Sequence, residues 1–147
     1  ATDVDPVAVR VARRNLAPVG GQVHEGDLFA ALPASLRQAC DVVVANVPYV
    51  PHDQLRLMPR EAREFEPAVA LDGGADGLDV LRRVAGEVRT WLAPGGSLLT
   101  EVSPAQSVAG AAALGAAGLV VREVVPEDDD ETMVLVATWH AATAQCS

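Results

Sequence analysis

The sequence predicts an α/β fold with a mainly parallel sheet and a final antiparallel strand. Clusters of Val and Ala alternate with amphipathic stretches along the whole chain, as they do when strands and helices take turns. Residues 41–45 (DVVVA) form an almost continuous apolar run, which is typical of a buried parallel strand. Near the C-terminus, the acidic run 127–131 separates two apolar stretches, which predicts a closing hairpin.

The first half of the chain alternates strand and helix signals. Residues 2–4 have the character of a strand end, and Asp5 followed by Pro6 predicts a helix start, because Asp is a good N-cap and Pro suits the first helical position. Apolar residues then recur at helical spacing, namely Ala8, Ala12 and Leu16. A short strand at 22–24 and the strand at 41–45 follow, and a proline-rich loop runs from 46 to about 59.

The second half continues the same alternation. A short helix is expected at 60–66 and a loop at 71–77. The clearest helical stripe consists of Leu78, Leu81, Val84, Ala85, Val88 and Leu92. Pro94, Gly95 and Gly96 are expected to end that helix and lead into a strand at 97–101. Ser103 and Gln106 have the spacing of a capping box, which opens an Ala-rich helix that ends near Gly118. Strands at 119–125 and 132–139 complete the order.

Composition bounds the class of protein. A chain of 147 residues predicts one domain, here residues 1–140 with a tail at 141–147. A net charge of −9 and the absence of Lys disfavour binding to a phosphate backbone. Cys40, Cys146 and three scattered histidines provide no convincing metal set. Without a membrane-length apolar run or a signal-peptide layout, the expectation is a cytoplasmic protein read from a fragment or processed chain.

Asn46-Val47-Pro48-Tyr49 follows the strand at 41–45 directly, and ligands of open α/β sheets bind at the carboxyl ends of strands. The Asn46 side-chain carbonyl and the Val47 main-chain carbonyl can accept both N–H groups of a planar amide. Pro48 restricts the residue before it to extended conformations. Tyr49 offers a flat ring face for an amide and a nearby cation; this role assigns nothing to its hydroxyl. The same four residues are equally typical of an ordinary turn.

The surroundings of this motif resemble the HemK or PrmC type of glutamine methyltransferase, which modifies peptide-chain release factors. Residues 46–49 resemble the family's Asn-Pro-Pro-Tyr motif, and 65–71 (FEPAVAL) resemble its Glu-Pro-x-x-Ala-Leu segment. Residues 73–78 (GGADGL) resemble the glycine-rich continuation, and Glu101 and Gln106 match the Glu of the fifth strand and the Gln after it. A PrmC-related branch with Val in the second motif position is the most similar.

The resemblance implies a Rossmann-like methyltransferase fold, S-adenosylmethionine as the cofactor and a peptide chain release factor as the partner. It assigns catalysis to Asn46 and substrate binding to residues 46–49 and Glu66. Cofactor binding is assigned to Asp3, which matches the ribose-binding acid, to Asp27 with Leu28, which meet adenine, and to Asn46. The family's first strand and its glycine-rich cofactor loop have no counterpart in this sequence. The full product of the gene, called the parent protein, is therefore expected to be the enzyme. This chain alone is expected to be an incomplete enzyme.

Several alternatives stay open. Asp27 can alternatively serve as a turn or N-cap aspartate, Asp5 is better explained as a helix cap, and Glu66 can equally be a satisfied loop carboxylate. The capping box alone explains Gln106. A nucleic-acid amine methyltransferase would share the motif, because adenine also presents a planar amino group, although the acidic charge disfavours it. A non-catalytic remnant or interaction module is the third possibility.

Overall fold

The protein is described with a computed structural model that covers residues 1–58, 68–126 and 132–140. The expected helix at 60–66, Glu66, the acidic turn at 127–131 and the tail at 141–147 lie outside these described residues. The chain divides into two compact units, Ala1–Arg37 and Gln38–Ser147.

The first unit is built around one helix and two short parallel strands. They are β1 (Thr2–Asp3), α1 (Pro6–Leu16) and β2 (His24–Glu25). The helix begins as predicted: the Asp5 side chain accepts a hydrogen bond from the Val7 amide at 2.8 Å, and Pro6 occupies the first helical position. Val9 is its buried residue. The strand expected at 22–24 is shorter, since it comprises only His24–Glu25 and so begins two residues later and ends one residue later.

The second unit contains a four-stranded mixed sheet with the order β3-β4-β6-β5. Its strands are β3 (Cys40–Ala45), β4 (Leu92–Val102), β5 (Val120–Pro126) and β6 (Met133–Thr138). β3 pairs with β4 in parallel, whereas β6 is antiparallel to both of its neighbours. β3, β4 and β5 thus share one direction and only the last strand is reversed, which confirms the predicted arrangement.

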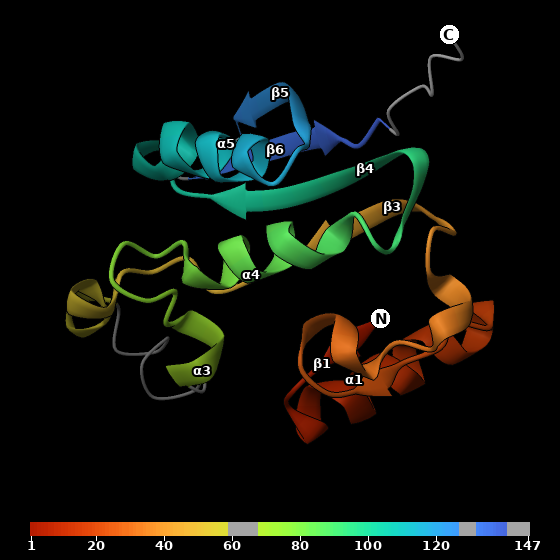
Figure 1. Cartoon of the computed structure of the whole chain (residues 1–147). Helices are drawn as coiled ribbons and strands as arrows, with labels where there is room; N and C mark the ends of the chain where they lie inside the picture. The colour runs from red at the N-terminus through yellow and green to blue at the C-terminus, as the bar shows by residue number, and fades with distance from the viewer. Residues whose placement is uncertain (59–67, 127–131, 141–147) are drawn as a thin grey trace, which may run out of the picture. The chain divides into compact units, whose positions relative to one another are not determined.

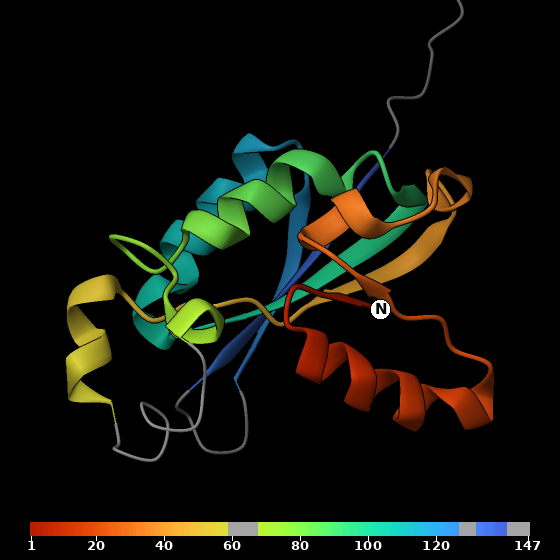
Figure 2. The ribbon, with the colours of Figure 1, turned by 90° about the horizontal axis from the view of Figure 1, so that it is seen from below.

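Two helices cover one face of this sheet. They are α4 (Asp79–Val88) and α5 (Ser107–Ala116), which Figures 1 and 2 show side by side. A shorter helix, α3 (Ala68–Leu71), precedes them, and a 3-10 helix at His52–Leu57 lies within the expected loop. The core between helices and sheet consists of fully buried apolar side chains, including Leu78, Leu81, Val88, Leu98, Leu114 and Leu135.

The structure corrects two predictions. The helical stripe ends at Val88, and Leu92 is the first residue of β4, so Pro94, Gly95 and Gly96 lie inside a strand and do not end the helix. The error arose because an apolar residue such as Leu92 fits both the end of a helical stripe and the start of a buried strand. The strand at 41–45 is also less buried than expected, because β3 is an edge strand of the sheet; Val42 is 57% exposed and Val44 is 73% exposed.

Candidate functional site

Residues 46–49 follow β3 directly, at the carboxyl end of a parallel strand. Ala45 pairs with Thr100 of β4, so the motif begins at a fixed point of the sheet. Asn46 is exposed, Val47 is 9% exposed, and Pro48 and Tyr49 are half-buried. Within the described ranges, no hydrogen bond engages the Asn46 side-chain amide. Its carbonyl is therefore available to an incoming donor, as the predicted role requires.

Tyr49 is held by its hydroxyl and by its main-chain carbonyl. The hydroxyl donates a 2.9 Å hydrogen bond to Oε1 of Glu101, near the end of β4. The carbonyl oxygen accepts a 2.8 Å hydrogen bond from Nε2 of Gln106. The prediction for Tyr49 concerned only its ring face, so both contacts were missed. Both partners had been singled out in the sequence, but their distance along the chain hid the connection.

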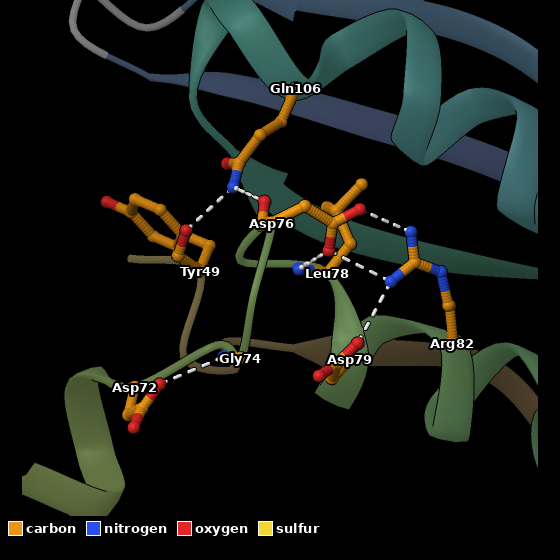
Figure 3. A network of polar contacts seen from close by, with 8 residues as sticks. All are labelled: Tyr49, Asp72, Gly74, Asp76, Leu78, Asp79, Arg82 and Gln106. Atoms are coloured by element: carbon orange, nitrogen blue, oxygen red, sulfur yellow. Dashed lines mark hydrogen bonds and ion pairs between the residues drawn. The ribbon is translucent and has the colours of Figure 1, made fainter. Parts of the chain in front are cut away.

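Gln106 does more than close a helix cap. The predicted capping box with Ser103 is confirmed, since the Gln106 Oε1 accepts from the Ser103 amide at 3.0 Å and from its hydroxyl at 2.8 Å. The other end of the same side chain donates to the main-chain carbonyls of Tyr49 and Asp76 (Figure 3). The capping box alone therefore does not account for this residue.

The glycine-rich segment runs beside the end of the motif. The Val50 amide donates to the Leu71 carbonyl at 3.2 Å, and the Gly73 amide donates to the Val50 carbonyl at 2.9 Å. Gly77 has a φ of +77°, and a Cβ at this position would overlap the Gln106 Nε2 and the Tyr49 carbonyl oxygen. Only glycine permits this close approach without strain. The segment 73–78, matched to the family in the sequence, thus packs against the motif's last residue.

Arg82 and His52 each form ion pairs with carboxylates in or near this segment. Arg82 donates to both carboxylate oxygens of Asp76 and to Asp79, and its guanidinium lowers the pKa of the Asp76 carboxyl to about 2 (Figure 3). His52 Nδ1 lies 2.7 Å from the Asp72 carboxylate, which raises the pKa of His52 above its ordinary 6.5 and lowers that of Asp72. Both pairs are exposed to solvent, so their individual contribution to stability is small.

The first unit places Asp3 and Asp27 at one edge of its small sheet. Asp3 is the last residue of β1, and Asp27 follows the parallel neighbour β2 by two residues. Asp3 Oδ1 accepts from the Asp5 amide at 2.8 Å, while Asp5 caps α1 as expected. Leu28 has a positive φ of 44°, which is uncommon outside glycine and marks a strained position. The relation of Asp3 and Asp27 to Asn46, in the other unit, remains a prediction.

The described residues add two further findings. In the ranges 1–58, 68–126 and 132–140, no group of three or more His, Cys, Asp or Glu side chains could hold a metal ion. In the same ranges, the helices are all too short or too polar to cross a membrane.

Comparison with known proteins identifies relatives over nearly the whole chain, although no family model matches it. A release factor glutamine methyltransferase of Cereibacter sphaeroides is 37% identical over 146 residues, which cover 97% of this chain and 51% of the relative. A ribosomal protein uL3 glutamine methyltransferase of Bordetella pertussis is 43% identical over 106 residues, covering 69% of this chain and 34% of the relative. The chain thus spans about half, or less, of the length of the relatives it matches.

Among solved structures, the fold is similar to that in the E. cuniculi Mtq2-Trm112 complex responsible for methylation of the eRF1 translation termination factor. The TM-score is 0.62 at 23% sequence identity, covering 95% of this chain and 70% of the other. At this identity the likeness supports the fold only. It confirms the predicted Rossmann-like methyltransferase fold.

Proposed function

The chain belongs to the release factor glutamine methyltransferase (HemK/PrmC) family, and on this premise we propose that it carries the acceptor-binding part of an enzyme that methylates a protein glutamine. The reaction transfers a methyl group from S-adenosylmethionine to the side-chain amide nitrogen: an N–CH3 bond forms as the S–CH3 bond breaks, S-adenosylhomocysteine leaves, and one amide N–H proton passes to water. The full product of the gene encoding this chain, here called the parent protein, performs it. We propose that residues 1–140 belong to the catalytic domain of that protein.

The motif Asn46–Tyr49 binds the acceptor amide. An amide nitrogen is a weak nucleophile, because its lone pair is delocalised into the carbonyl. The side-chain carbonyl of Asn46 and the main-chain carbonyl of Val47 accept its two N–H groups, which directs the nitrogen toward the methyl donor. Catalysis then comes mostly from positioning. The observation that supports this role is the exposed Asn46 amide at the end of β3, without a hydrogen-bond partner among the described residues. Pro48, Tyr49 and, by resemblance, Glu66 complete the substrate-binding side.

The carboxylates of the first unit are of the right type to bind S-adenosylmethionine. Asp3 is the last residue of β1, and Asp27 follows the neighbouring parallel strand β2. At these strand ends a carboxylate can accept hydrogen bonds from ribose hydroxyls or from an adenine amino group. Leu28 lies next to Asp27 and supplies an apolar contact for the adenine. When bound, the sulfonium cofactor supplies an electrophilic methyl group. The proposed role of the residues named here is to bind and orient the cofactor and the acceptor amide.

The substrate class is a glutamine of a peptide chain release factor. The support is the similarity to a release factor glutamine methyltransferase over 97% of this chain. A glutamine of ribosomal protein uL3 is the second candidate, because the relative with that name is 43% identical over a shorter stretch. A nucleic acid acceptor is disfavoured by the net charge of −9 and by the absence of Lys.

A substrate panel tests this proposal. The parent protein is incubated with cofactor carrying a labelled methyl group and with a release factor, with ribosomal protein uL3 or with RNA. Each protein substrate has a matched control in which the acceptor glutamine is replaced by alanine. We expect label in the release factor and none in its alanine control. Label in uL3 alone would move the substrate to the second candidate, and label in RNA alone would overturn glutamine methylation.

A further inference from the structure

Gln106 is a buried polar residue whose carboxamide is fully used. The residue is 7% exposed. The Oε1 atom accepts two hydrogen bonds from Ser103, and the Nε2 atom donates to the carbonyl oxygens of Tyr49 at 2.8 Å and of Asp76 at 2.9 Å. A primary amide has two N–H donors, so both are paired. Figure 3 shows this amide between the loop that carries Tyr49 and the loop that carries Asp76.

The two halves of this side chain serve different purposes. A capping box is satisfied by either Glu or Gln, because it needs only a side-chain acceptor for the Ser103 amide. The two N–H groups are what Gln adds to this role, and both point at main-chain carbonyls that lie 57 and 30 residues away in sequence. The choice of Gln is therefore explained by the loops and not by the helix.

The motif is fixed at both ends by these contacts. Its first residue follows Ala45, which is paired with β4. Its last residue is held by Gln106 through the carbonyl and by Glu101 through the hydroxyl. Gly77 leaves the space that lets the Gln106 amide and the Tyr49 carbonyl meet. A stretch of four residues between two fixed points has little freedom left, so the directions of the Asn46 and Val47 carbonyls depend on the anchor at Tyr49.

We propose that Gln106 is a positioning residue for methyl transfer: its amide N–H groups lock the Tyr49 and Asp76 carbonyls and thereby set the pose of the acceptor-binding motif. The inference rests on the proposed function of that motif. Gln106 itself touches no reacting atom in this account. Its removal should therefore lower turnover and leave the affinity for the cofactor intact.

Gln106→Glu separates the two halves of the side chain. It keeps an acceptor for the capping box, but it places a carboxylate oxygen against two carbonyl oxygens. We expect kcat of the parent protein to fall by about tenfold to a hundredfold, the scale of a small misplacement of reacting groups. The affinity for S-adenosylmethionine, measured by calorimetry, should stay unchanged. Gln106→Met removes the donors without adding charge, although it also removes the capping acceptor, and it should show the same split.

Ser103→Ala is the matched control. It removes one of the two hydrogen bonds that Oε1 of Gln106 accepts, keeps the other, from the Ser103 main-chain amide, and leaves both N–H contacts of Gln106 in place. We expect its kcat to equal that of the unaltered protein within the error of the assay. Full kcat in Gln106→Glu and Gln106→Met would overturn the positioning role. So would an equal loss in Ser103→Ala, because the cap would then account for the effect.

Tyr49 is the only tyrosine among these 147 residues. Its ring resonances in the parent protein, assigned by comparison with Tyr49→Phe, report on the loop without any activity assay. We expect these NMR signals to shift in Gln106→Glu and to stay in place in Ser103→Ala. Absence of methyl transfer by the unaltered parent protein would overturn the proposed function only, and the tyrosine signals would then decide the positioning claim alone. Unmoved signals in Gln106→Glu would overturn it.

Discussion

The Tyr49 hydroxyl donates a 2.9 Å hydrogen bond to the Glu101 carboxylate, which ties the loop after β3 to the end of the neighbouring strand β4. Hydrogen bonds to charged groups are stronger than those between neutral groups. The sequence predicted a role only for the ring face of Tyr49, so this contact of the hydroxyl was not predicted.

Tyr49→Phe should therefore lower the free energy of unfolding by about 1.5 kcal/mol, the lower end for a hydrogen bond to a charged group. Glu101→Gln, which keeps an acceptor oxygen, should cost less than Glu101→Ala. Chemical denaturation of Tyr49→Phe, Glu101→Ala and the double variant measures the coupling. Strictly additive losses would show that the two side chains do not interact in solution.

Gly77→Ala tests the close packing of the glycine-rich segment against the motif. The added Cβ would overlap the Gln106 amide and the Tyr49 carbonyl, and the backbone at φ +77° is unfavourable for alanine. We expect a loss of about 1–3 kcal/mol in stability, together with reduced methyl transfer. Gly86→Ala is the control, because Gly86 lies within α4 and an added Cβ meets nothing within 4 Å. It should stabilise the protein by about 0.5–1 kcal/mol; a similar loss in both variants would contradict the account.

Asp3 and Asp5 should separate in cofactor binding. In the parent protein, Asp3→Ala is expected to weaken the affinity for S-adenosylmethionine, because Asp3 is proposed to hold the ribose. Asp5→Ala removes the cap of α1 and should mainly cost stability, about 1 kcal/mol. Calorimetry and thermal unfolding on both variants measure the two effects. The reverse order of affinities would move the ribose role to Asp5.

His52 should titrate above its ordinary pKa of 6.5, because the Asp72 carboxylate stabilises its protonated form. A pKa raised by folding adds stability that is fully present below 6.5 and is lost as the pH rises through the raised value. Asp72→Asn should bring the midpoint down, although Asp53 still favours the protonated ring. NMR titration of the His52 ring measures this directly. An unchanged midpoint in Asp72→Asn would show that the pair does not form in solution.

Local signals in the sequence predicted local structure well. The cap at Asp5, the strand at 41–45 and the capping box at Ser103 each depend on residues within a few positions, and the structure confirms all three. The predicted start of β4 was wrong, because Leu92 fits both a helical stripe and a strand. Gly96 lies in that strand, where an added Cβ would come within 3.1 Å of carbonyl oxygens of Cys40 and Asp41. Only the pairing with β3 reveals this requirement.

The candidate site was predictable by motif but not by contact. Residues 46–49, Glu101 and Gln106 were all singled out from the sequence. The bonds among them were not foreseen, since the partners of Gln106 are main-chain carbonyls, which carry no signal in the residue types. The exposure of Val44 was missed for a related reason: an apolar run shows that a strand suits burial, and the position of the strand in the sheet decides how much of it is covered.

Asn46→Ala in the parent protein tests the central claim most directly. The assay measures transfer of labelled methyl groups to a release factor, with a release factor that lacks the acceptor glutamine as the control, and calorimetry measures cofactor affinity in parallel. We expect transfer to fall by about a hundredfold or more, the cost of losing one preorganised polar group in an active site. Cofactor affinity should stay nearly unchanged, because the ribose and adenine are proposed to be held by Asp3 and Asp27, and the main proposed role of Asn46 is to bind the acceptor amide. Full transfer by Asn46→Ala would contradict the account.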